Sequence, residues 1–426
     1  MKACWLLVLG WAWCCPAAMR EVGESLAAAM AAAQPGDTIL IAGPRVFHEH
    51  LVVTKPLLLL GTNAPVIDGD GVGTPLLLRA GGAAVRGVIV RNGGHDLGAL
   101  DCGIRLEASR LAVERCRVEG GGFGIYLRGA DRACIRDNVV LGDRSLPPPQ
   151  RGNGIHLWKA RDNIITGNVV RETRDGVYLS YADRNLLASN RIEQTRFGIH
   201  YMYSHYNRLE DNDLRANAVG AALMFARECL VAGNRAVANR RHGVLLLQVE
   251  HSRVCGNVVL GQNRGFFVQQ AVQDRFEGNV IAENDIGVYL SNGSEDNRFV
   301  GNAFVHNTAQ VWLPPELFDA AGLAGNTFAE RGRGNYWSDY TGSDLDHDGV
   351  GDTAYHQTDL FGYLVERYPA VRLFALSPAA TLLRKGEELL PLLEAPGLTD
   401  PCPLMQPPGR AAALLQRFRH EPAAGI

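Results

Sequence analysis

Residues 176–197 read GVYLSYADRNLLASNRIEQTRF, and residues 198–219 read GIHYMYSHYNRLEDNDLRANAV. Each stretch opens with glycine, an apolar residue, any residue and an apolar residue. About ten residues later it has asparagine, any residue and an apolar residue. The pattern recurs from about residue 100 to residue 310 in steps of 21 to 23 residues, apart from one step of 30. The repeat glycines are Gly103, Gly124, Gly154, Gly176, Gly198, Gly220, Gly243, Gly265 and Gly287, and the repeat asparagines are Asn138, Asn168, Asn190, Asn212, Asn234, Asn257, Asn279 and Asn302.

A fixed period of this length is typical of a solenoid, in which each unit buries its apolar face only against the next unit. In the unit 176–197 we expect three short strands, at 176–179, 185–187 and 190–192, separated by polar turns. Three short strands per coil predict an all-β fold, a right-handed parallel β-helix of about 22 residues per coil. We expect each repeat asparagine to take a left-handed backbone conformation and to stack its amide on the next, and each repeat glycine to form a tight corner.

A leucine-rich repeat is the main alternative, because its period is similar. That repeat needs the pattern L-x-x-L-x-L and a helical back to each unit. The present units are rich in Gly, Asn and Val and contain no helical stretch. The β-helix is therefore the favoured prediction.

The composition is that of a folded protein: 46% of the 426 residues are hydrophobic and 20% are charged. The formal net charge of -3 provides no basic field to attract nucleic acid. Lys2, the apolar run 4–13 and the small residues Ala17 and Ala18 are typical of a secretory signal peptide. A short buried helix is the alternative reading of this segment. We expect export, and a periplasmic location if the organism has two membranes.

The chain divides into four predicted segments: a signal peptide at 1–18, the parallel β-helix at 19–316, an irregular capping region with an Asp-rich loop at 317–370, and a C-terminal tail at 371–426. A short helix within 20–34 would cap the first coil. The tail contains a Leu-rich helical stretch followed by prolines, which favours a docking segment. A cap on the last coil is the alternative for this tail.

Met202 and Met224 occupy equivalent places in consecutive units, and His200 and His205 lie in the first of these units. Thioether and imidazole ligands together suit Cu(I), whereas few carboxylates surround them to favour Mg²⁺ or Ca²⁺. The four residues are our candidate copper ligands, on a face of the β-helix directed to solvent or to a partner. The alternative is an aromatic and Met stripe that packs against a partner without any metal.

A second candidate metal site lies in the sequence DLDHDGVGD at 344–352. Asp344, Asp346 and Asp348 alternate as in the first half of an EF-hand loop, with glycine in the sixth place and Asp352 in the ninth. The closing glutamate is missing, because Tyr355 stands in the twelfth place. We expect a structural Ca²⁺ site, with an Asp-rich turn without metal as the alternative.

Enzymes built on parallel β-helices commonly act on acidic polysaccharides and need carboxylates aligned in one groove. Asp175, Asp183, Glu210 and Asp211 lie near turns, but Arg and Asn occupy the same places in other units. No nucleophile elbow, P-loop or H-E-x-x-H motif is present. We therefore predict a protein that is not an enzyme, and a secreted polysaccharide-binding or polysaccharide-cleaving protein is the alternative. A docking platform that binds no metal is a third reading.

Beyond the repeat, the chain resembles the NosD family in PGDTI at 35–39, KPL at 55–57, PVIDG at 65–69 and GNYWSDY at 334–340. The resemblance covers most of the chain after the signal peptide, and the ends are more specific than the repeats. It implies a periplasmic β-helical protein of nitrous-oxide reductase maturation that helps deliver copper to that enzyme. It also implies a membrane ABC transporter, engaged through the tail at 371–426, and a copper chaperone lipoprotein as partners. The resemblance does not assign copper ligands, so His200, Met202, His205 and Met224 rest on spacing.

Overall fold

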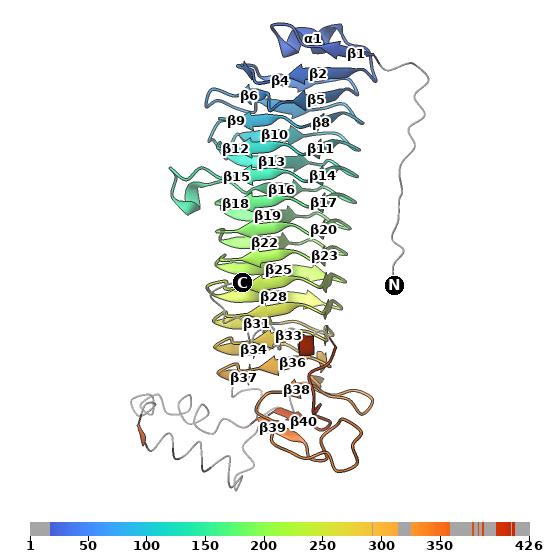
Figure 1. Ribbon diagram of the computed structural model, residues 1–426, viewed down its shortest axis with the longest axis vertical. Coiled ribbons are helices and arrows are strands. Elements are labelled where there is room, and N and C mark those ends of the chain that lie inside the picture. The colour runs from blue at the N-terminus through green and yellow to red at the C-terminus, as the bar shows by residue number, and fades with distance from the viewer. Residues whose placement is uncertain are drawn as a thin grey trace.

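The chain folds as a long parallel β-helix in a computed structural model (Figure 1). The structure describes residues 18–291, 293–313, 325–357, 398–409 and 411–413, together with residues 377, 378, 382 and 386. Its main strands stack into three parallel sheets, here called A, B and C, of 13, 13 and 12 strands. Successive coils pair in register about 22 residues apart, as Val177 with Ile199. The predicted all-β parallel β-helix is therefore confirmed.

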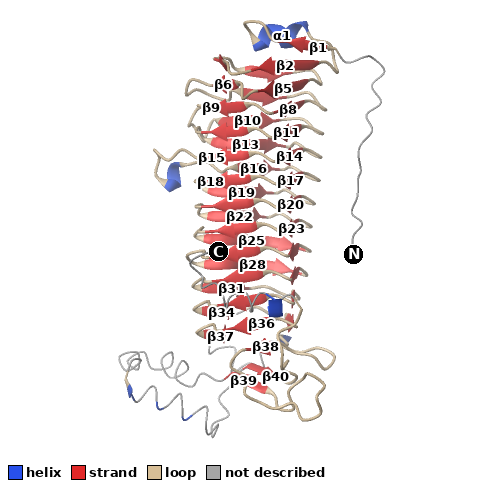
Figure 2. Ribbon diagram, viewed as in Figure 1, coloured by secondary structure: helices blue, strands red, loops and turns tan. Residues whose placement is uncertain are grey.

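Figure 2 shows strands along the whole stack, with helix confined to its first end, a side loop and the last part of the chain. Sheet A contains β1 (Met19–Glu21), β2 (Thr38–Ala42), β5 (Leu58–Thr62), β8 (Ala84–Arg86), β11 (Ala112–Glu114), β14 (Cys134–Arg136), β17 (Ile164–Thr166), β20 (Leu186–Ala188), β23 (Arg208–Glu210), β26 (Leu230–Ala232), β29 (Arg253–Cys255), β32 (Arg275–Glu277) and β35 (Arg298–Val300). Sheet B contains β3 (Val46–Phe47), β6 (Val66–Asp68), β9 (Ile89–Arg91), β12 (Arg117–Glu119), β15 (Val139–Leu141), β18 (Val169–Arg171), β21 (Arg191–Glu193), β24 (Asp213–Arg215), β27 (Arg235–Val237), β30 (Val258–Leu260), β33 (Val280–Ala282), β36 (Ala303–Val305) and β38 (Tyr336–Trp337). Sheet C contains β4 (Leu51–Val53), β7 (Leu76–Leu78), β10 (Cys102–Leu106), β13 (Phe123–Arg128), β16 (Ile155–Trp158), β19 (Asp175–Ser180), β22 (Phe197–Met202), β25 (Val219–Arg227), β28 (His242–Glu250), β31 (Arg264–Gln269), β34 (Ile286–Leu290) and β37 (Ala309–Trp312).

The core runs along the axis of the β-helix, because alternate residues of every strand point inward. In the coil that begins at Gly176, Val177, Leu187 and Ile192 come from the three different sheets, and none of them has exposed surface. A short 3₁₀ helix, η1 (Pro148–Gln150), lies in a loop that leaves the stack between β15 and β16. The described coils otherwise consist of strands and turns, which excludes a leucine-rich repeat.

The repeat asparagines form a buried ladder inside the β-helix. Both the backbone N–H and the Nδ2 of Asn190 donate to Oδ1 of Asn212, at 3.0 and 2.9 Å, and Asn212 repeats this toward Asn234. The residue with positive φ is the one before each asparagine, such as Asp211 at 51°. The predicted stacking of amides is confirmed, whereas the predicted left-handed asparagine is wrong. The preceding residue makes the turn, and the asparagine amide then satisfies backbone groups at the corner.

The repeat glycines serve close packing rather than a corner conformation. A Cβ on Gly198 would lie 2.4 Å from the carbonyl oxygen of Gly220 in the next coil, and Gly198 has no positive φ. The expectation of a tight corner is therefore corrected. The glycines let successive strands of sheet C start in close contact with the side chains of sheet B.

The first coil is closed by a shorter helix than the sequence predicts. Helix α1 (Leu26–Ala32) has the Ser25 hydroxyl as its N-cap and buries Leu26 and Met30, while residues 19–21 form strand β1 instead. The predicted signal peptide at 1–18 lies outside the described residues apart from Ala18. No helix among the described residues has both the length and the apolar character that a bilayer crossing requires.

The other end of the stack extends past residue 316, where the sequence predicted that it stops. Thr327 bridges to β35, and β38 pairs in parallel with β36. The Trp337 ring closes the core, with its centroid 4.2 Å from that of Phe304 and 4.3 Å from that of Tyr355. Asn335 continues the ladder from Asn302, and the signal was present in the sequence, because Asn335 also stands two residues before a large apolar residue.

A small antiparallel sheet covers this end. It consists of β39 (Tyr355–Gln357) and β40 (Leu398–Asp400). Asp400 is fully buried, and its Oδ2 accepts hydrogen bonds from Asn335 N at 2.7 Å and from Trp337 Nε1 at 2.8 Å. Residues 398–400, which the sequence placed in the tail, therefore help to close the β-helix. The described part of 317–370 also contains regular strands, so this region is less irregular than predicted.

Candidate metal centre

The two methionines singled out by their spacing are neighbours on the outer face of sheet C. Met202 on β22 and Met224 on β25 are paired directly across the parallel ladder. Both side chains are half-buried. Parallel strands lie about 4.8 Å apart, so the two thioethers are within reach of a single soft ion.

His200 lies on the same strand and face as Met202, two residues before it, and is held by a buried carboxylate. Its Nδ1 lies 3.0 Å from Oδ2 of Asp175, whose side chain also accepts hydrogen bonds from Arg196 Nε and Nη2 at 2.8 and 2.7 Å. Burial opposes ionisation of Asp175, but the hydrogen bonds from His200 and Arg196 lower its pKa overall. The ionised carboxylate accepts from Nδ1 of His200 and orients the ring, so Nε2 is the nitrogen left for another partner.

The exposure of His200 differs from the sequence prediction, because the residue is only 7% exposed. The rings of Phe197 and Tyr178 cover it, with centroids 4.5 and 4.9 Å away. Its Nε2 is buried and makes no hydrogen bond within the part of the chain that the structure describes. An imidazole whose Nε2 makes no hydrogen bond, on the same strand and face as Met202, forms with the methionine pair the kind of soft donor set that suits Cu(I).

His205 lies in the turn after β22. Its backbone N–H donates to Asp183 Oδ1 at 2.9 Å, and its ring meets Tyr206 edge-on at 6.4 Å between centroids. Among the described residues, no hydrogen bond or ring contact joins His205 to His200 or to the methionines. The structure thus brings His200, Met202 and Met224 onto one face and leaves His205 at its edge.

The Asp-rich loop brings together three of its four predicted ligands. Oxygen atoms of Asp344, Asp346 and Asp348 lie within 4.8 Å of one another. The Asp352 carboxylate instead accepts a hydrogen bond from the backbone N–H of Leu345 at 2.7 Å.

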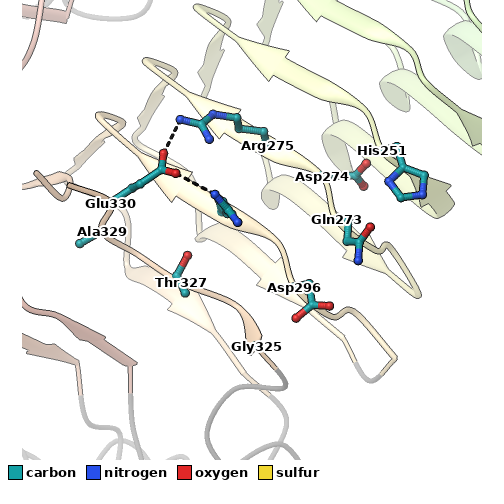
Figure 3. Close-up of a pocket in the computed structure, with 10 residues that line it drawn as sticks. His251, Gln273, Asp274, Arg275, Asp296, Gly325, Thr327, Ala329 and Glu330 are labelled. Carbon is teal, nitrogen blue, oxygen red and sulfur yellow. Dashed lines mark hydrogen bonds and ion pairs between the residues drawn. The ribbon is translucent and has the colours of Figure 1, made fainter.

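A polar groove of about 790 Å³ lies on the side of sheet A (Figure 3). Three carboxylates line it. Glu330 is paired with both Arg275 and Arg298, and Asp274 belongs to an internal hydrogen-bond ladder through Ser252 N. Of the three carboxylates, Asp296 is thus the one outside these ion pairs and the ladder. Glycosidases work with a pair of free carboxylates, which this groove does not provide.

Sequence reasoning missed the Asp175–Arg196 clamp on His200, because it placed Asp175 near a turn. Asp175 is in fact the first residue of β19 and is 1% exposed. Its position directly before the repeat glycine was the available signal. The residues directly before the repeat glycines lie on the side of the candidate site. The linear sequence, however, does not show that residues 175, 196 and 200 come into contact.

The family model described as "Periplasmic copper-binding protein (NosD)" matches residues 142–342. A "Probable ABC transporter binding protein NosD" of Pseudomonas aeruginosa is 39% identical over 378 residues, which cover 85% of this chain and 87% of that protein. This chain belongs to the NosD family. A second NosD protein, from Stutzerimonas stutzeri and described in the same words, is 36% identical over 381 residues, 85% of each chain.

The NosD family model is described as periplasmic and copper-binding, and these two relatives as probable ABC transporter binding proteins. Neither description is that of an enzyme. Among solved structures, the Dettilon tailspike protein matches with a TM-score of 0.55 at 16% identity, covering 69% of this chain and 64% of that chain. A GH87 α-1,3-glucanase catalytic domain matches with a TM-score of 0.54 at 11% identity, covering 77% and 70%. At such low identity these matches show the β-helix fold alone.

Proposed function

We propose that this NosD-family chain is a periplasmic assembly factor that helps deliver copper to nitrous-oxide reductase, together with a membrane ABC transporter and a copper chaperone lipoprotein. Copper is its cargo, held transiently as Cu(I) by His200, Met202 and Met224, with His205 at the edge of the site. The observation that carries the proposal is the Met202–Met224 pair beside a histidine whose other nitrogen is held by Asp175.

The donor set suits transfer rather than permanent storage. Two thioethers and one neutral imidazole bind Cu(I) without a thiolate, and the half-buried methionines are open to an incoming partner. An ion held by few neutral ligands can leave when a partner offers additional ones. The family description as periplasmic and copper-binding supports this role, and export would depend on the signal peptide at 1–18.

The test of the proposal is the double substitution Met202→Leu and Met224→Leu. Leucine nearly matches methionine in volume, so the melting temperature should change little. We expect the Cu(I) affinity to fall at least about 100-fold, since altering groups beyond the ligands already costs about 10–100-fold. Competition with a chromophoric Cu(I) chelator under reducing conditions measures it. Met30→Leu, in helix α1, is the matched control, and an unchanged affinity in the double variant would remove the site.

The same titration tests the role of Asp175 as a positioning residue. In Asp175→Asn the neutral amide no longer fixes the Nδ1–H tautomer of His200, and we expect about 10–100-fold weaker Cu(I) binding. The ¹⁵N shifts of the His200 ring should show a mixture of tautomers, which a merely structural role would not produce. A single unchanged tautomer with full affinity would contradict the assignment.

We further propose that the tail engages the ABC transporter through the part that precedes β40. Residues 398–400 close the β-helix, so deleting all of 371–426 would also damage the fold. Deleting 371–397 alone should abolish co-purification with the membrane transporter while Cu(I) binding to the purified protein persists. Intact co-purification would exclude this segment, most of which lies outside the described residues.

For the Asp-rich loop we propose a structural Ca²⁺ held by Asp344, Asp346 and Asp348, with Asp352 fixing the loop backbone. Gly351 N donates to Pro403 O at 2.8 Å, so the loop also contacts the segment that closes the β-helix. Addition of Ca²⁺ should raise the melting temperature of the wild type and not that of Asp346→Asn. A wild type that does not respond to Ca²⁺ would leave this loop as a metal-free turn.

A further inference from the structure

The outer face of sheet B changes from charged to apolar along the β-helix. On β21, β24 and β27 the first outward column holds Arg191, Asp213 and Arg235. In the next three coils the same column holds Val258, Val280 and Ala303. The second outward column changes in the same way, from Glu193 and Arg215 to an unbroken apolar run. We call the apolar part the sheet B stripe, and its members are Val237, Val258, Leu260, Val280, Ala282, Ala303 and Val305.

These stripe residues point away from the core, because the residues between them on the strands, Val259, Ile281 and Phe304, belong to the core. They are nevertheless covered: Leu260 is 2% exposed, Ala282 1% and Ala303 0%. They form a hydrophobic cluster separate from the core of the β-helix. An outward face that is apolar and covered needs a partner element that lies outside the coils.

The described residue from outside the coils that packs on this stripe is Ala411. It is 3% exposed and belongs to the same cluster. Residues 411–413 are helical, and Ala412 and Ala413 are exposed. Figure 1 shows this short helical piece beside β33 and β36. Residues 411–413 therefore form a helical turn whose Ala411 side chain lies on sheet B.

The sequence that follows continues this face. Residues 411–420 read AAALLQRFRH, with apolar residues at Ala411, Leu414, Leu415 and Phe418. This i, i+3, i+4, i+7 spacing is that of an amphipathic helix. Ten helical residues span about 15 Å. The stripe covers three steps between coils from Val237 to Val305, or about 14 Å.

We propose that residues 411–420 form an amphipathic helix that docks on the sheet B stripe of its own β-helix. The occupant is the C-terminal end of this chain, since Ala411 already sits on the stripe and the apolar side chains that follow it match the stripe in length. The proposal is independent of copper. It assigns the last helix to the protein itself and leaves the segment before β40 as the part of the tail available to another protein.

The test uses the full-length protein and its own trypsin sites at Arg417 and Arg419. A docked helix protects these sites, so wild type should be cut at them at least about tenfold more slowly than a synthetic peptide of residues 408–426. Phe418→Glu should remove most of the protection, and so should Val280→Asp on the stripe. Ala413→Glu, on the exposed side, is the matched control and should keep the wild-type rate. Intact mass spectrometry follows the cuts.

Circular dichroism and the melting temperature show whether each variant keeps its coils, and Phe418→Glu lies outside the coils altogether. Loss of protection in Phe418→Glu and Val280→Asp, with protection kept in Ala413→Glu, supports the docked helix. A wild type cut as fast as the peptide, or a Phe418→Glu variant that stays protected, overturns it. Neither result depends on copper binding, so the copper proposal is judged separately.

Discussion

Replacing Asp274 with asparagine is expected to stabilise the protein, and far more at pH 8 than at pH 4. Asp274 occupies a column of inward amides that includes Asn163, Asn185, Asn207, Asn297 and Asn326. Its Oδ1 accepts a hydrogen bond from Ser252 N at 2.7 Å, while its Oδ2 is buried without a partner in the described structure. In asparagine, the amide nitrogen at that place donates to neighbouring oxygens, which an ionised carboxylate cannot do.

The pH dependence follows from the pKa of Asp274. Burial raises this pKa from 3.8 to about 7, and Glu250 adds to the effect. The folded state therefore holds the proton more tightly than the unfolded state, and stability is lost as the pH rises from about 4 to about 7. At about 1.4 kcal/mol per pKa unit, the total loss is about 4 kcal/mol. The gain in unfolding free energy from Asp274→Asn should therefore be about 4 kcal/mol larger at pH 8 than at pH 4.

Urea unfolding of the wild type and Asp274→Asn across pH 4 to 8 measures this difference. The reverse substitution, Asn297→Asp in the same column, is the matched control and should introduce a similar loss of stability with rising pH. Equal pH profiles for the wild type and Asp274→Asn would show that the Asp274 carboxyl is not neutral in the folded protein.

Asn212→Ala is expected to destabilise the protein by at least about 4 kcal/mol. The Asn212 side chain is 1% exposed, and its Oδ1 accepts from both N and Nδ2 of Asn190. Its Nδ2 donates to Leu187 O at 2.9 Å and to Asn234 Oδ1 at 2.9 Å. Alanine would leave several buried donors and acceptors unpaired, and each costs about 1–3 kcal/mol.

Chemical unfolding of Asn212→Ala should therefore show an early transition or no folded protein at all. The control is Asn263→Ala: this exposed asparagine donates to Asp285 at 2.8 Å, and its loss should cost well under about 1 kcal/mol because water replaces it. If the two variants were equally stable, the ladder would not be what holds the corners of the coils.

Much of the fold was predictable because the repeat reports a nearest-neighbour structure. A glycine and an asparagine that recur about every 22 residues indicate coils in which equivalent residues stack on one another. The pairing of Met202 with Met224, which are 22 residues apart, could therefore be predicted from their spacing alone. The end of the stack was not predicted, because the coil that contains Asn335 follows a longer step from Asn302 and its inward residue is Trp337.

For the candidate site, counting along the chain predicted which residues share a column but not what surrounds them. His200 was expected at the surface, yet Phe197 and Tyr178 cover it and Asp175 holds it. The contact of Ala411 with the sheet B stripe could not be predicted from the sequence either. It joins residues more than 100 positions apart, and no repeat relates them.

The sequence by itself determined the β-helix, its period and the vertical pairing of its side chains, because these depend on residues one coil apart that recur at a fixed spacing. Only the tertiary structure decided the burial of His200, the burial that raises the pKa of Asp274, and the closure of the end by Asp400. Those properties depend on solvent exclusion and on hydrogen-bond partners contributed by different columns, turns and ends of the chain, which no one-dimensional period encodes.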